Sequence, residues 1–116
     1  MDKLTRYRAI IKDALVQRAD LMRGQPLAGE EVVCLFEEAT DNYVLLRLGW
    51  LQNKRLYSVT LHLRLFAEGT VQVEQDWTED FLAELIAAGV AENDIVLAFT
   101  PPELRPHPRT TASIAA

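Results

Sequence analysis

The residues best suited to chemistry in this sequence are a histidine and two carboxylates. His62 lies in a segment where apolar and polar residues alternate, and Glu74 and Asp76 lie in the next such segment. A hairpin between the two segments places His62 opposite Glu74, with Asp76 two residues further on. These groups could act as a general acid and base, or hold a metal ion, in a nuclease or hydrolase. Catalysis needs such groups to converge in a pocket, whereas a sheet presents them in a row, so we favour solvated pairs between strands.

No other motif in the sequence predicts catalysis or a bound cofactor. The chain has no glycine-rich phosphate loop, no serine elbow and no metal-binding motif. Its single cysteine, Cys34, excludes an internal disulfide and a zinc site of four thiolates, and its apolar neighbours predict a buried side chain. We therefore predict no catalytic residue, no cofactor and no metal site.

The composition is that of one soluble globular domain. The 116 residues are 49% hydrophobic and 25% charged, a balance that supports a folded core. The net charge of −5 argues against strong nucleic-acid binding, which depends on lysine and arginine neutralising phosphates. Since the sequence shows neither an apolar run long enough for a membrane span nor a secretory signal, we predict a cytoplasmic protein.

Charge is distributed unevenly along the chain. Residues 1–23 hold six of the twelve basic residues, and residues 65–104 hold nine acids with no lysine or arginine. Such a separation can steer a partner or set the register of an oligomer, although two solvated faces explain it equally well. A DNA-binding first helix is a weaker alternative, because Asp2, Asp13 and Asp20 interrupt its basic residues.

Hydrophobic periodicity predicts two helices. Apolar residues at three- and four-residue steps predict the first over residues 2–23, with Asp2 as its N-cap and Gly24 at its end. The second is predicted over residues 76–89, where Thr78 can cap the first turn.

Five strands are predicted, at 32–38, 42–50, 55–66, 70–75 and 95–99. From Tyr57 onward in the third strand, apolar residues alternate with polar ones, which predicts one apolar face along its whole length. Matching the apolar faces of neighbouring strands pairs Trp50 with Arg55, Leu65 with Val71 and Leu63 with Val73. A three-residue loop with Gly69 at positive φ satisfies the pairing of the last hairpin.

These elements predict an α+β fold, with a mainly antiparallel sheet of about five strands packed by two helices. Four of the strands form a meander, and the second helix precedes the last strand. We predict a single domain over residues 1–108. Residues 109–116 form a tail with little to bury, which we expect to be flexible unless it pairs with a sheet edge.

The segment TPPELRP follows the last predicted strand and forms a rigid corner. Thr100 can cap a single helical turn whose prolines need no N–H donor, which holds the corner's charged residues in fixed positions. A rigid corner loses little entropy on binding, so we predict a partner-binding edge made by the corner and the adjoining acidic helix. The predicted edge consists of Glu103, Arg105, Trp77, Glu79 and Asp80. The alternatives are a chain reversal that only packs the end of the sheet and, for Trp77 and Trp50, partial burial in the core.

Four segments of the chain resemble the XisI proteins, the family of fdxN element excision controlling factors. They span residues 1–106 in the family's order and spacing, and they read MDKLTRYRAIIKDAL, YVLLRLGW, RLYSVTLHLRL and DWTEDFLAELIAAGVAENDIVLAFTPPELRP. The resemblance implies a small α+β protein of cyanobacterial type, which controls a site-specific DNA excision during heterocyst differentiation. It implies a regulator and not the recombinase itself, and it supplies no catalytic residue.

Two functions remain as alternatives. The first is a non-enzymatic accessory protein that binds a protein partner or a second copy of itself; the resemblance implies that the partner is an XisH-like factor or a recombinase. The second is a metal-assisted nuclease or hydrolase built on His62, Glu74 and Asp76. The net acidity of the chain and its lack of catalytic motifs favour the first function.

Overall fold

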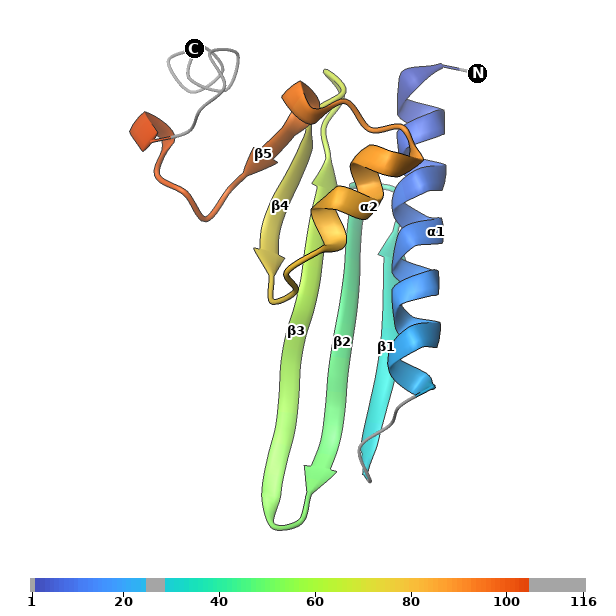
Figure 1. Cartoon of the computed structure of the whole chain (residues 1–116), viewed down its shortest axis with the longest axis vertical. Coiled ribbons are helices and arrows are strands. Elements are labelled where there is room, and N and C mark those ends of the chain that lie inside the picture. Colours follow the sequence, from blue (N-terminus) through green and yellow to red (C-terminus); the bar gives the residue numbers. More distant parts are fainter. Residues whose placement is uncertain (1, 25–28, 105–116) are drawn as a thin grey trace.

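The computed structural model describes residues 2–24 and 29–104, which form an α+β fold as predicted (Figure 1). The elements are α1 (Lys3–Arg23), β1 (Glu30–Glu37), β2 (Asn42–Leu51), β3 (Lys54–Leu65), β4 (Val71–Asp76), α2 (Phe81–Ala88), the 3-10 helix η1 (Glu92–Asp94), β5 (Ile95–Leu97) and the 3-10 helix η2 (Pro102–Leu104). The tail predicted at residues 109–116 lies outside the described residues. None of the described helices is long and apolar enough to cross a membrane.

The five strands form one sheet in the order β1-β2-β3-β4-β5, and both α-helices pack against the same face of it. The first four strands are antiparallel neighbours, whereas β5 lies parallel to β4 after the crossover through α2. One apolar cluster joins α1, α2 and this face of the sheet, which we call the helix side. Tyr7 and Ile11 of α1 and Phe81 and Leu85 of α2 are fully buried in the cluster, and each such side chain contributes about 1.5–3 kcal/mol.

Side-chain hydrogen bonds fix where the two α-helices begin. Asp2 Oδ1 accepts a hydrogen bond from the Thr5 N–H at 2.7 Å, so the predicted N-cap of α1 is confirmed. The α2 helix begins at Phe81, later than the predicted start at Asp76. The reason is that the Asp76 carboxylate accepts hydrogen bonds from the Thr78 N–H and hydroxyl and holds a turn there. Thr78 Oγ1 in turn accepts from the Phe81 N–H at 3.2 Å, but Asp80 and not Thr78 occupies the N-cap position, so the predicted cap is wrong by two residues.

The hairpin registers follow the predictions near both turns. Trp50 pairs with Arg55, and Leu65 pairs with Val71, as expected. Gly69 supplies the positive φ of 92° that the second turn requires. Turn chemistry and matching of apolar faces are therefore sufficient to set the pairing at these two ends.

A β-bulge at Thr60 changes the face that the first half of β3 presents. Leu46 of β2 pairs with Val59, but its neighbour Leu45 pairs with Leu61, so Thr60 is an extra residue in β3. Leu45 and Leu61 are buried on the helix side, and because side chains alternate along β2, Leu46 and Val59 lie on the opposite face. The prediction that the apolar residues of β3 share one face is therefore wrong.

A second bulge, at Glu74, shifts the pairing between β3 and β4. Leu63 pairs with Val73 as expected, but His62 pairs with Gln75 because Glu74 is the extra residue. The predicted pairing of His62 with Glu74 is therefore wrong.

The β5 strand is shorter than predicted. It ends at Leu97, where the Thr100 N–H donates to the Leu97 carbonyl at 3.0 Å and closes a turn. Pro101 and Pro102 follow directly and have no N–H with which to continue a strand ladder. Phe99, which was expected in the strand, is exposed instead.

A cluster of hydrogen bonds and an ion pair around a buried carboxylate connects α1 to the segment before β5. The Tyr7 hydroxyl donates to Asp94 Oδ2 at 2.6 Å, and the Ala91 N–H donates to the Tyr7 oxygen at 3.0 Å. Lys3 Nζ lies 2.8 Å from the same carboxylate oxygen. Asp94 is only 4% exposed, so these contacts satisfy a carboxylate whose unpaired burial would be costly.

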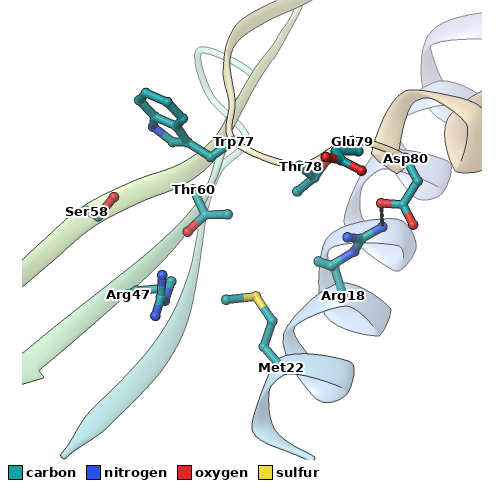
Figure 2. A pocket seen from close by; sticks show the side chains of 9 residues that line it. All are labelled: Arg18, Met22, Arg47, Ser58, Thr60, Trp77, Thr78, Glu79 and Asp80. Atoms are coloured by element: carbon teal, nitrogen blue, oxygen red, sulfur yellow. Dashed lines mark hydrogen bonds and ion pairs between the residues drawn. The ribbon is translucent and has the colours of Figure 1, made fainter. Parts of the chain in front are cut away.

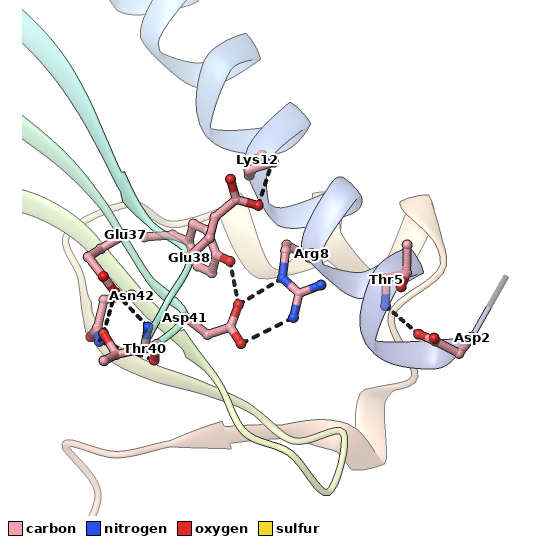
Figure 3. A network of polar contacts seen from close by, with 10 residues as sticks. Asp2, Thr5, Arg8, Lys12, Glu37, Glu38, Thr40, Asp41 and Asn42 are labelled. Atoms are coloured by element: carbon pink, nitrogen blue, oxygen red, sulfur yellow. Dashed lines mark hydrogen bonds and ion pairs between the residues drawn. The ribbon is translucent and has the colours of Figure 1, made fainter.

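A second cluster of polar contacts attaches α1 to the turn between β1 and β2 (Figure 3). Arg8 donates to Asp41 from Nε at 2.8 Å and from Nη2 at 3.2 Å, and Lys12 Nζ lies 3.2 Å from Glu38 Oε1. The hydrogen bonds from Arg8 hold the pKa of the Asp41 carboxyl below its ordinary value of 3.8. Asp41 lies at φ 55°, a left-handed conformation that aspartate and asparagine adopt more readily than most residues.

We predict that Tyr7→Phe lowers the free energy of unfolding by about 1–3 kcal/mol, because it removes a donor from the buried Asp94 carboxylate and takes away the acceptor of the Ala91 N–H. Urea denaturation measures the change. The control is Tyr57→Phe at an exposed position, where the change should stay within about 0.5 kcal/mol. Equal effects from both variants would contradict a structural role for the Tyr7 hydroxyl.

We predict that Asp41→Asn lowers the free energy of unfolding at neutral pH by roughly 1–2 kcal/mol, while asparagine preserves the backbone conformation. Because the folded pKa of Asp41 is depressed, its stabilisation is complete above pH 3.8 and is lost as the pH falls through the folded value. Denaturation at a series of pH values should therefore show the two proteins converging in acid. A difference that grows as the pH falls would contradict the assignment.

Candidate functional site

A groove of about 670 Å³ lies between α1, the turn before α2 and the helix side of β2 and β3 (Figure 2). Its lining residues are Arg18, Met22, Arg47, Ser58, Thr60, Trp77, Thr78, Glu79 and Asp80. Arginines, hydroxyls and acids thus line the groove, and the one large aromatic ring, that of Trp77, lies at its margin (Figure 2). This mixture resembles the polar rim and aromatic anchor of a protein interface more than the largely apolar pocket of a small-molecule site.

The bulge at Thr60 forms the sheet side of this groove. Because the bulge reverses the first half of β3, Ser58 and Thr60 face the groove where apolar side chains were expected. Arg47 pairs with Ser58 across the two strands and lies on the same side. The Trp77 N–H donates to the Thr60 carbonyl at 3.0 Å, which holds the turn before α2 against β3.

Trp77 projects from that turn with its ring largely in solvent. The residue is 74% exposed, more than any other large apolar side chain in the described ranges. It also lines a second hollow of about 350 Å³, together with Phe99 and residues of β4. An exposed tryptophan beside a concave surface is a typical anchor of a protein interface.

Arg18 lies at the α1 side of the groove and is paired with acids of α2. Its Nη2 donates to Asp80 Oδ1 at 2.9 Å and also to Glu84, and its guanidinium lies 5.7 Å from the centre of the Phe81 ring. The side chain is 10% exposed, and its Nε has no hydrogen-bond partner within residues 2–24 and 29–104. Burial acts to lower the pKa of Arg18, but the two carboxylates outweigh it and raise the pKa above the ordinary value.

Arg47 is neutralised in the same way on the sheet side of the groove. Its Nε donates to Glu30 Oε2 at 2.7 Å, and Nη2 lies 2.5 Å from the same oxygen. The Glu30 side chain is almost entirely buried, so the pair is held inside the protein. Neither arginine therefore presents an uncompensated positive charge to a ligand in the groove.

Comparison with known proteins identifies the family. The family model described as "XisI protein" matches residues 1–110. The chain belongs to the XisI family. A similar solved structure is the fdxN element excision controlling factor XisI from Anabaena variabilis, with 31% identity, a TM-score of 0.75, and coverage of 88% of this chain and 97% of that one.

A second similar structure is an XisI-like protein, also from Anabaena variabilis, with 25% identity and a TM-score of 0.80. The alignment covers 88% of this chain and 92% of that one. A comparison with curated proteins found no match. The XisI relationship therefore covers nearly the whole chain, and it agrees with the resemblance seen in the four sequence segments.

In this XisI-family chain, the predicted partner-binding residues lie in different places. Trp77, Glu79 and Asp80 line the groove together. Glu103 lies in η2, exposed and away from the residues that line the groove, and Arg105 lies outside the described residues. Whether the five residues form one binding edge remains a prediction.

The sequence analysis missed four of the groove's polar residues. These are Arg18, Arg47, Ser58 and Thr60. Their strands and helix were predicted, but the bulge that directs Ser58 and Thr60 toward α1 leaves no trace in the alternating pattern. In the sequence the two arginines are visible only as basic residues inside amphipathic segments, and nothing there places them beside Trp77.

The structure does not bring together His62, Glu74 and Asp76 as an acid–base or metal-binding site. His62 Nε2 lies 2.9 Å from Asn42 Oδ1, whereas the Asp76 carboxylate is occupied by Thr78. No group of three or more histidine, cysteine, aspartate or glutamate residues within residues 2–24 and 29–104 could hold a metal ion. Burial lowers the pKa of His62, and the nearby charge of Glu74 partly opposes the effect.

We predict that His62 titrates below its ordinary pKa of 6.5 and that Glu74→Gln lowers this pKa further, because the variant removes the charge that favours imidazolium. NMR of the imidazole signals measures both values. Asp76→Asn is the matched control and should leave the pKa of His62 in place, since Asp76 binds Thr78 instead. Equal shifts from the two variants would indicate a coupled His62–Glu74–Asp76 site after all.

Proposed function

We propose that this chain is a non-enzymatic regulatory protein that acts by binding a protein partner through the groove beside Trp77. The observation that carries the proposal is the position of Trp77, which is held to β3 by its backbone while its ring lies 74% exposed at a concave surface. Packing in the core would bury such a ring, whereas a preformed interface leaves it available to a partner.

The charge of the groove favours a protein partner over a nucleic acid. Both of its arginines are already paired with carboxylates, while Glu79 adds a negative charge to the lining. A phosphate backbone would have to displace these carboxylates and would meet a chain of net charge −5. Hydroxyls of Ser58 and Thr60 can instead exchange hydrogen bonds with a polypeptide segment that packs against Trp77.

The similarity to known proteins supports a regulatory role. One of the similar structures is named an fdxN element excision controlling factor, and a controlling factor acts on another component of its system. For this chain, we infer that the component is an XisH-like factor or a site-specific recombinase, and that binding it regulates DNA excision. On this proposal the chain contributes recognition, and its partner contributes the DNA chemistry.

We predict that Trp77→Ala weakens binding to the partner by at least about tenfold, the effect expected for an interface anchor. The chain is co-expressed with the XisH-like protein and, separately, the recombinase of the same genome, and complexes are measured by size exclusion and calorimetry. Leu21→Ala is the control, because Leu21 is also an exposed apolar residue but does not line the groove. Binding to neither protein, or full binding by the Trp77 variant, would refute the proposal.

A double variant, Glu103→Ala with Arg105→Ala, tests how far the surface extends. If the predicted edge is correct, this variant weakens the same complex, although less than loss of Trp77. Undiminished binding would confine the surface to the groove and exclude the proline-bounded corner from it.

A further inference from the structure

The face of β1–β3 that points away from the helices is apolar and lies apart from the groove. Leu48 of β2 pairs with Tyr57 of β3, and Trp50 pairs with Arg55. Residues paired directly across two strands point to the same side of the sheet. Leu48 and Trp50 lie an odd number of residues from Leu45 along β2, so they point away from the core that Leu45 faces. We call this surface the open face. Its members are Glu31, Val33, Leu35, Leu46, Leu48, Trp50, Arg55, Tyr57 and Val59.

The open face presents several large apolar side chains to solvent. Trp50 is 56% exposed and Tyr57 65% exposed at one end of the face, and Leu35 is exposed at the other end, level with Val44, with the buried Leu46 between them. In the described part of the chain, both α-helices pack on the opposite side of the sheet (Figure 1). Contiguous apolar patches of this kind usually mark an interaction surface.

We propose that a second copy of this chain covers the open face, so that two sheets pack face to face around a two-fold axis parallel to β2. The charges at the margins of the face suggest this occupant. Glu31 lies on β1 at one margin, level with Leu48, and Arg55 lies on β3 at the other. A two-fold axis along the central strand places β1 of one copy over β3 of the other, so the acid of each copy meets the base of its partner.

The side chain of Arg55 is already placed for such a contact. Its guanidinium carbon lies 5.8 Å from the centre of the Trp50 ring and 5.9 Å from that of Tyr57, and Nη1 donates to the Gly49 carbonyl at 3.0 Å. These contacts hold the charge over the aromatic residues, close to the level of Leu48. No residue of the described ranges forms an ion pair with Glu31. Each copy therefore offers Glu31, whose charge no other described residue pairs with, and Arg55, whose charge is held in position to meet the Glu31 of a second copy.

The size of the face predicts a weak dimer. The members span five positions on each of three strands, which at about 3.4 Å per residue and about 4.8 Å between strands gives a face on the order of 250 Å². Two copies then bury on the order of 500 Å² through these residues, which is below the range of stable interfaces. We expect monomer and dimer to exchange, with the dimer favoured at high protein concentration.

Charge reversal tests the geometry of this dimer. Glu31→Arg and Arg55→Glu should each raise the dissociation constant roughly fivefold or more, because each places two like-charge pairs in the interface. The double variant restores opposite charges and should recover most of the affinity. Sedimentation equilibrium across a wide concentration range measures the dissociation constants, and circular dichroism confirms that each variant is folded.

Asp13→Arg is the control, since Asp13 is exposed on α1 on the other side of the sheet, and it should leave dimerisation unchanged. A chain that stays monomeric at every concentration, or a double variant without recovery, would overturn the proposal. So would a dimer that the control weakens equally. If the chain is monomeric and Arg55→Glu instead abolishes binding of the XisH-like protein, the open face belongs to that partner. Because Trp77 lies outside the open face, loss of its partner would leave this dimer intact.

Discussion

The β-bulge at Thr60 is the local feature on which both proposed surfaces depend. One extra residue in β3 reverses the side that each preceding residue faces, while the pairing with β2 continues. Ser58 consequently lies in the groove beside α1, and Tyr57 lies on the open face. A regular strand would have placed the aromatic ring under the helices and left no polar groove there. The sheet therefore has two different halves. One half packs against the helices, and the half that contains Ser58 and Tyr57 presents the groove on one side and the open face on the other.

The uneven distribution of charge in the sequence is largely resolved inside the folded chain. Four basic residues of α1 pair with acids from later segments: Lys3 with Asp94, Arg8 with Asp41, Lys12 with Glu38, and Arg18 with Asp80 and Glu84. Most of these pairs are partly exposed and individually weak, but they fix the helix at both ends and in the middle. The charge separation therefore positions α1, and it need not steer any partner.

Local signals predicted the parts of this fold that have local causes. Asp2 caps α1 and Gly69 shapes its turn through contacts within a few residues, so their sequence context was sufficient. The bulge at Thr60 was not predictable, because Val59 and Leu61 preserve perfect alternation and only packing against the helices distinguishes the faces. Of the residues that line the groove, the sequence singled out only Trp77, Glu79 and Asp80, which are neighbours in the chain, as part of a predicted partner-binding edge. The arginines of the groove come from distant elements, and tertiary structure alone brings them there.

The hydrogen bond between Tyr7 and Asp94 joins groups 87 residues apart, and this separation constrains the order of events during synthesis. The meander of β1, β2 and β3 uses contacts between neighbouring segments and can pair as soon as it leaves the ribosome. The first helix emerges earlier still, but its buried tyrosine has no partner until Asp94 has been translated. The rest of the helix can pack on β1, β2 and β3 earlier, so closure of this buried hydrogen bond is the late step, and it joins a helix already packed on the sheet to the segment before β5.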